Sequence, residues 1–170
     1  PRFTMGHFLL SMVLLWNAVV LTHKAADPRP QLAPPRIRQM IWTTGIIGSV
    51  LLISGTIVTG SGPHSGSNKA EVAERLPFIV RDVARIHAVI AIILLIVVAA
   101  LWRLSSQAGL KEIARRAQLV AALLILQGAI GYWQYFTGVP VLLVAVHITL
   151  ASLTWISIVR LQLTARSRTT

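Results

Sequence analysis

Long apolar segments without any charged side chain alternate along the chain with short segments rich in Lys, Arg and Pro. A helix needs roughly 20 residues to cross a hydrocarbon layer about 30 Å thick. Five segments approach or reach that length: about Phe3 to Thr22, Gln39 to Thr59, Ile86 to Trp102, Ala117 to Gln134 and Val141 to Val159. They are apolar on every face, whereas barrel strands would alternate in polarity. The pattern predicts an all-α polytopic membrane bundle of five transmembrane helices, with the last four as an up-and-down four-helix bundle.

The connectors between these segments differ in character. The first, HKAADPRPQLAPPRIRQ, is rich in proline and is expected to be an irregular, solvated loop. The last is the uncharged turn Thr137 to Pro140, where Gly and Pro both interrupt a helix. A short last connector would place the fourth and fifth spans side by side.

Composition supports a membrane protein and limits its partners. Hydrophobic residues make up 55% of the chain and charged residues 12%, and the mean hydropathy is +0.70, which is too apolar for a soluble domain. The net charge of +11 comes from residues in the gaps between apolar segments, so lipid headgroups explain it better than nucleic acid, which is not expected as a partner. There is no cysteine, which excludes disulfides and thiolate metal sites.

The distribution of Lys and Arg predicts an orientation. The Pro-rich connector, the connector from Arg103 to Arg116 and the C-terminal tail are rich in positive charge, and the turn at Gly138 has none. Positive connectors stay on the cytoplasmic side. We therefore expect a multi-pass protein of the cell membrane, most simply a bacterial plasma membrane, with its N-terminus outside and its C-terminus cytoplasmic.

Two histidines are expected at one depth in the membrane. At about 1.5 Å per residue, His87 lies roughly 7 Å past Asp82, and His147 lies roughly 10 Å past Pro140. In an up-and-down bundle their helices are diagonal, roughly 12 to 14 Å apart, which leaves room for a haem between two imidazoles. Haem iron accepts such axial nitrogens. His87 and His147 are therefore candidate haem ligands, although a hydrogen-bonding role across helices without metal stays open.

Other polar residues near this layer have two interpretations each. Arg81 and Arg85 carry positive charge where haem propionates would emerge, and they fit equally well as interfacial anchors of a helix. Gln127 and Gln134 need hydrogen-bond partners and are candidates to line the site. A zinc site is disfavoured, because it would need three or four ligands at close spacing.

The remaining histidines are His7, His23 and His64. His7 lies near the start of the first span, in the same layer as the pair. His23 stands beside Lys24 and is interpreted as an interfacial residue. His64 belongs to the glycine-rich segment GSGPHSGS, where a solvated loop residue and a contact to a cofactor both stay open.

Four stretches together resemble haem A synthase. GTIVTGSGPHSGS (Gly55 to Ser67), RIHA (Arg85 to Ala88) and QGAIGYWQYFTGVPVLLVAVH (Gln127 to His147) resemble the C-terminal half of that family. MGHFLLSMVLLWNAVVLTHKA (Met5 to Ala25) resembles the helix that closes its N-terminal half. The resemblance covers most of the chain.

The resemblance implies an eight-helix membrane enzyme of two tandem four-helix bundles that acts in cytochrome oxidase assembly. It would oxidise the C8 methyl of haem O to a formyl group. His87 and His147 match the pair that holds a haem b, and His7 matches one ligand of the substrate haem iron. The other ligand and the catalytic glutamate would lie on a helix that this chain does not contain, so no catalytic residue is assigned here. The cysteine pairs that many members carry are also absent.

This comparison implies a division of the chain and a function. Residues 1–25 would be the last helix of a truncated catalytic bundle, residues 26–38 a cytoplasmic linker, and residues 39–170 the haem-binding bundle. The expected function is that of a membrane oxidoreductase of haem A biosynthesis, of which this chain mainly supplies the bis-histidine haem b bundle. The alternatives are a non-enzymatic cytochrome b electron carrier and a transporter or structural module.

The expected partners follow from the same reading. They are haem O as substrate and the lipid bilayer, with haem O synthase and cytochrome oxidase assembly factors as further candidates. A homo-oligomer stays open.

Overall fold

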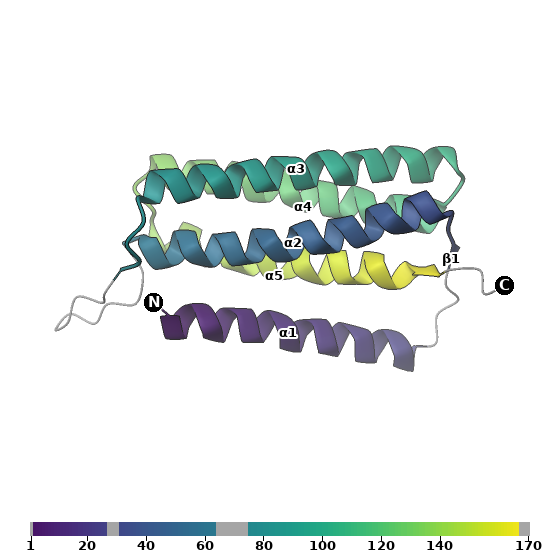
Figure 1. The fold of residues 1–170 in the computed structure, drawn as a ribbon, viewed down its shortest axis with the longest axis horizontal. Coiled ribbons are helices and arrows are strands. Elements are labelled where there is room, and N and C mark those ends of the chain that lie inside the picture. The colour runs from purple at the N-terminus through teal and green to yellow at the C-terminus, as the bar shows by residue number, and fades with distance from the viewer. Residues whose placement is uncertain (1, 27–30, 64–74, 167–170) are drawn as a thin grey trace.

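The computed structural model describes residues 2–26, 31–63 and 75–166, and within them it is an all-α bundle (Figure 1). The five helices are α1 (Arg2–Ala25), α2 (Pro35–Ser61), α3 (Val80–Gln107), α4 (Lys111–Phe136) and α5 (Val141–Thr164). Each is long and apolar enough to cross a membrane. The predicted fold class is confirmed, and the chain is a multi-pass membrane protein.

Helices α2 to α5 form an up-and-down four-helix bundle. Consecutive helices pack against each other, and α5 closes the bundle by packing against α2. This order makes α3 and α5 one diagonal and α2 and α4 the other. Helices α1, α3 and α5 run in one direction and α2 and α4 in the other (Figure 1).

Helix α1 lies outside the four-helix bundle and packs mainly along α5, with a smaller contact to α2 (Figure 1). The indole Nε1 of Trp155 in α5 donates a 3.0 Å hydrogen bond to the carbonyl oxygen of Met12. Met12 and Val19 are the buried side chains of α1. The packing of α1 beside the bundle agrees with the sequence expectation, and its assignment to a second, catalytic bundle stays a prediction.

The charged connector expected from Arg103 to Arg116 is much shorter than predicted. Helix α3 continues to Gln107 and α4 starts at Lys111, so only a three-residue turn remains, in which Gly109 has φ +70°. Helices need not end where the hydrocarbon ends, because charged side chains on their last turns reach water. The ion pairs of Glu112 with Arg115 and Arg116 lie on such a helical surface.

The Pro-rich connector is also more regular than predicted. Helix α2 starts at Pro35 and not near Gln39, because proline suits the first helical position, where no intrahelical N–H bond is needed. Two short strands, β1 (Gln31–Leu32) and β2 (Ala165–Arg166), pair in parallel and join this connector to the end of α5. The expectation of a wholly irregular loop is therefore wrong for residues 31–38.

The uncharged turn occurs where it was predicted. Helix α4 ends at Phe136 and α5 starts at Val141. Gly138 has φ +78° and Val139 has φ +61°. Glycine adopts this left-handed conformation freely, whereas it is strained for a β-branched residue such as valine.

Packing divides the four-helix bundle into two halves. The histidine half comprises Val50–Ser61 of α2, Val80–Ile93 of α3, Ile125–Phe136 of α4 and Val141–Leu153 of α5. The packed half comprises the remainder of these helices. Every buried apolar side chain that the structure describes in α2 to α5 belongs to the packed half, where Leu94, Val98, Leu101, Ile113, Val120 and Leu161 are among the members of one core cluster.

Candidate haem site

His87 projects from α3 toward α2, where it contacts two adjacent residues. The hydroxyl oxygen of Ser54 lies 2.8 Å from its Nδ1. A Cβ built on the next residue, Gly55, would lie 3.2 Å from the Cε1 atom of the ring, which is closer than most real contacts. Glycine at this position therefore lets the imidazole lie directly on the backbone of α2.

His147 has an equivalent relation to the helix that precedes it. A Cβ on Gly131 of α4 would lie 3.3 Å from the Cε1 atom of His147 and 3.8 Å from its Nδ1. The bundle thus repeats one arrangement, in which a histidine of α3 or α5 packs on a glycine of α2 or α4. The polar contacts differ, because the Nδ1 of His147 is buried and has no hydrogen-bond partner among the described residues.

The two imidazoles lie in the same half of the bundle, as predicted. His87 packs on Gly55 of α2 and His147 on Gly131 of α4, and both side chains are half-buried. Their helices form a diagonal of the bundle. The structure therefore brings together the two residues that the sequence singled out on different helices.

The surroundings of the pair are polar at a few points and otherwise loosely packed. The Oε1 atoms of Gln127 and Gln134 in α4 are buried, with no hydrogen-bond partner among the described residues. These glutamines flank Gly131 by four residues on one side and three on the other, so all three share one face of α4. A buried carbonyl oxygen without a partner costs free energy comparable to that of a lost hydrogen bond.

These features fit a haem. A planar group between His87 and His147 would need two opposed imidazoles, space between the helices and no side chain on the nearest backbone. The described residues of the histidine half provide two imidazoles on diagonal helices, the two glycines and an interior without fully buried apolar side chains. The unpartnered Nδ1 of His147 and the two glutamine oxygens also indicate an interior whose polar groups are not satisfied by the protein alone.

The two arginines proposed for haem propionates lie on the first two turns of α3, on its exposed surface. Arg81 has a weak ion pair with Asp82, at 3.6 Å between exposed side chains. Arg85 forms no ion pair with the residues that the structure describes. Among the described residues, neither arginine forms a hydrogen bond or ion pair with the two histidines, so their role stays a prediction.

The other histidines are separate from the pair. His7 is exposed on α1, and its carbonyl oxygen accepts a 2.9 Å hydrogen bond from the hydroxyl of Ser11. His23 is half-buried in the last turn of α1. His64 lies outside the described residues.

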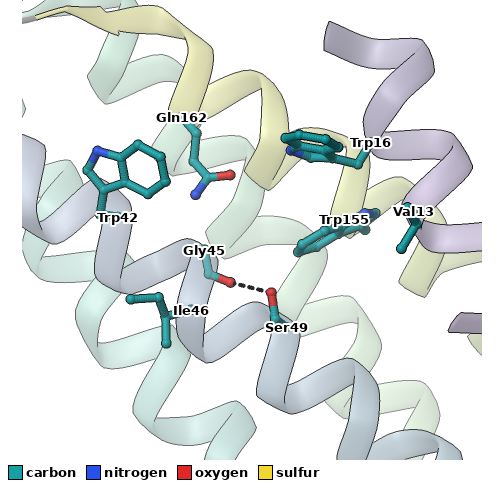
Figure 2. A pocket seen from close by; sticks show the side chains of 8 residues that line it. All are labelled: Val13, Trp16, Trp42, Gly45, Ile46, Ser49, Trp155 and Gln162. Carbon is teal, nitrogen blue, oxygen red and sulfur yellow. Dashed lines mark hydrogen bonds between the residues drawn. The ribbon is translucent and has the colours of Figure 1, made fainter.

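A separate cavity of about 310 Å³ opens between α1, α2 and α5 in the packed half (Figure 2). Its walls carry the indole rings of Trp16, Trp42 and Trp155, with the amide of Gln162 above Gly45 (Figure 2). None of the residues that line it is titratable. It therefore offers no ligand for a metal and is distinct from the histidine pair.

Ser54 is the residue of the candidate site that the sequence interpretation missed. Its signal was present, because it lies next to Gly55 and roughly as deep in its span as His87 in the antiparallel neighbour. Serine in an apolar helix usually bonds back to its own helix, so the residue type alone does not indicate a contact with a histidine. The two glycines, Gly55 and Gly131, give space to the two rings.

Comparisons with protein-family models, with curated proteins and with solved structures give no match for this chain.

Proposed function

We propose that this chain binds a haem between His87 and His147 and transfers electrons through it within a membrane. The observation that carries the proposal is the pair of imidazoles on the diagonal helices α3 and α5, in the half whose described residues include no buried apolar side chain, each lying on a glycine of the preceding helix. His87 and His147 would together hold the haem iron, and a haem held in this way would supply electron transfer and not oxygen binding.

The residues of the chain have distinct tasks in such a site. The haem iron, when bound, supplies a one-electron redox couple. His87 and His147 would hold the haem iron by their ring nitrogens. Apolar side chains of the four helices would limit access of water to it, which favours the less charged redox state. Arg81 and Arg85, exposed on the first two turns of α3, would pair with the propionates.

Within this proposal, the resemblance to haem A synthase supplies the wider role. The bundle would be the haem b half of an enzyme that oxidises the C8 methyl of haem O to a formyl group. His7 would then contribute to the substrate site, together with residues that this chain does not contain. The expected partners are haem O, haem O synthase and cytochrome oxidase assembly factors.

A second candidate is a cytochrome b that only carries electrons. The exposure of His7 on α1 favours it, because no acidic side chain of the described residues accompanies that histidine in a hydrogen bond or ion pair. In this case His7 has no role in chemistry. Both candidate functions share the haem site. They differ only in whether His7 on α1 contributes to a site for the substrate haem.

An optical spectrum of the purified protein tests the shared part. Protein produced with ample haem should show the sharp bands of a low-spin bis-histidine haem. His87→Ala and His147→Ala should abolish them, whereas the matched control His23→Ala should keep them. A haem-replete preparation without these bands, or bands that survive both alanine variants, would refute the proposal.

Haem analysis separates the two candidates. Membranes that contain the protein expressed from its native gene and a source of haem O should accumulate haem A, and His7→Ala should stop this while the bis-histidine spectrum stays. If haem O remains unchanged although the spectrum is intact, the electron carrier is the correct function.

A further inference from the structure

Ser54 makes two contacts with its hydroxyl group, and together they define where its proton lies. Its oxygen is 2.8 Å from the carbonyl oxygen of Leu51 and 2.8 Å from the Nδ1 atom of His87. A hydroxyl has one hydrogen to donate. The carbonyl of Leu51 can only accept, so the hydroxyl hydrogen points to Leu51 and the Ser54 oxygen faces His87 as an acceptor.

The histidine must then be the donor in its contact with Ser54. A neutral imidazole carries one proton, on either Nδ1 or Nε2. A proton on Nδ1 satisfies the Ser54 oxygen, whereas a proton on Nε2 would set two acceptors against each other at 2.8 Å. The Nε2 lone pair of His87 is thereby left free.

His147 has no such support. Its Nδ1 is buried without a hydrogen-bond partner in the described part of the chain. Nothing there selects one tautomer over the other. The two histidines, which the sequence treats as equivalent, are thus prepared unequally by their neighbouring helices.

We infer that Ser54 is a positioning residue that holds His87 as the Nδ1-protonated tautomer, with Nε2 directed to an iron. This inference rests on the haem site proposed above. When the ring nitrogen that is not bound to the metal donates a hydrogen bond, this bond fixes the orientation of a metal-bound histidine and raises its basicity. A more basic ligand stabilises ferric iron, so Ser54 lowers the midpoint potential of the haem.

Midpoint potentials of the purified haem protein test this inference. Ser54→Ala should keep the haem and its low-spin spectrum but raise the potential, seen as a several-fold larger reduced fraction at a fixed ambient potential. Ser54→Thr should restore the potential toward that of the wild type, because threonine keeps a hydroxyl that can bond to the preceding turn.

Ser49→Ala provides the matched control on the same helix. The hydroxyl of Ser49 also bonds back to its own helix, at 2.9 Å from the carbonyl oxygen of Gly45 (Figure 2), and it contacts no histidine. A purely structural effect of losing a serine from α2 should appear in both variants. Equal potentials in Ser54→Ala and Ser49→Ala would overturn the inference.

Nitrogen NMR on histidine-labelled protein gives a second readout that does not need haem. If the purified protein binds no haem, the haem proposal fails. The imidazole of His87 in the wild type should still be protonated at Nδ1, and Ser54→Ala should show a mixture of the two tautomers. The His87 signal is assigned by its absence from His87→Ala. Protonation of the wild-type ring at Nε2 would refute the role of Ser54 independently.

Discussion

The two halves of the four-helix bundle use the same helices in different ways. In the packed half, Leu94, Val98 and Leu101 of α3 are fully buried against the other helices. One turn further along the same helix, in the histidine half, no apolar side chain of the described chain is fully buried, and the contacts involve an imidazole, a hydroxyl and glycines. Close packing holds the bundle together at one end, which allows the other end to stay open for a ligand.

The largest expected effect is a loss of stability from truncating the packed half. Leu101→Ala removes a side chain that is 0% exposed and should lower the free energy of unfolding by about 2 kcal/mol or more, because the cavity cannot be refilled. Ile90→Ala, on the half-buried stretch of α3 in the other half, should cost clearly less. Unfolding in mixed detergent micelles measures both, and equal losses would remove the distinction between the halves.

The second prediction concerns the fit of the imidazole in the histidine half. Gly131→Ala places a methyl group 3.3 Å from Cε1 of His147, so the ring must shift by a few tenths of an ångström. We expect haem affinity to fall about tenfold, roughly 1.4 kcal/mol. Haem titration followed by absorbance measures this change.

Gly128→Ala is the matched control for that variant. It lies three residues away on α4, and a Cβ there meets nothing within 4 Å. Its haem affinity should equal that of the wild type, and its helix should gain slightly in stability because alanine favours helix. A similar loss of haem in both variants would mean that α4 responds as a whole and not through contact with His147.

The sequence predicted the helices and the histidine pair for a physical reason. Length and the absence of charge determine which segments cross a membrane, and depth can be counted from the ends, which is why His87 and His147 were matched correctly. The hydrogen bond from His87 to Ser54 depends on how α2 and α3 are rotated about their axes, and a segment that is apolar on every face gives little information on rotation. For the same reason, the sequence did not predict the division of the bundle into the packed half and the histidine half.

The ends of elements were predicted less well, because polar residues do not by themselves end a helix. The connector around Lys111 was taken as a loop on its charge, although Lys, Glu and Arg all favour helix. Pro35 was taken as part of a loop, although it starts α2. At Thr137 to Pro140 the prediction succeeded, because two consecutive residues there have positive φ and neither fits a helix.

The third prediction examines strain at the rim of the histidine half. Val139 has φ +61°, a conformation that costs an L-residue about 1 kcal/mol relative to glycine. Val139→Gly should therefore be more stable than Val139→Ala by about 1 kcal/mol, the reverse of the order found within a helix. Thermal unfolding of the two variants decides this, and greater stability of the alanine variant would show that the turn relaxes without strain.

The smallest expected effect comes from the charged end of the packed half. Glu112 pairs with Arg115 at 2.9 Å and with Arg116 at 2.7 Å on the first turns of α4. The side chain of Arg115 is largely exposed, and those of Glu112 and Arg116 are partly exposed. Glu112→Gln should lower stability by only about 0.5 kcal/mol, since exposed ion pairs contribute little.

Salt dependence and a second pair provide the control for this last prediction. The effect of Glu112→Gln should fade as salt is raised, because the charges are screened, and Asp82→Asn, which breaks the longer 3.6 Å pair with Arg81 in the other half, should have a still smaller effect. A loss above about 2 kcal/mol, comparable to that of a buried side chain, would mean that the charged ends and not the interior distinguish the two halves. With small effects at both ends, the difference in stability must come from the interior, where leucine and valine fill one half and the described residues of the other half include no fully buried apolar side chain.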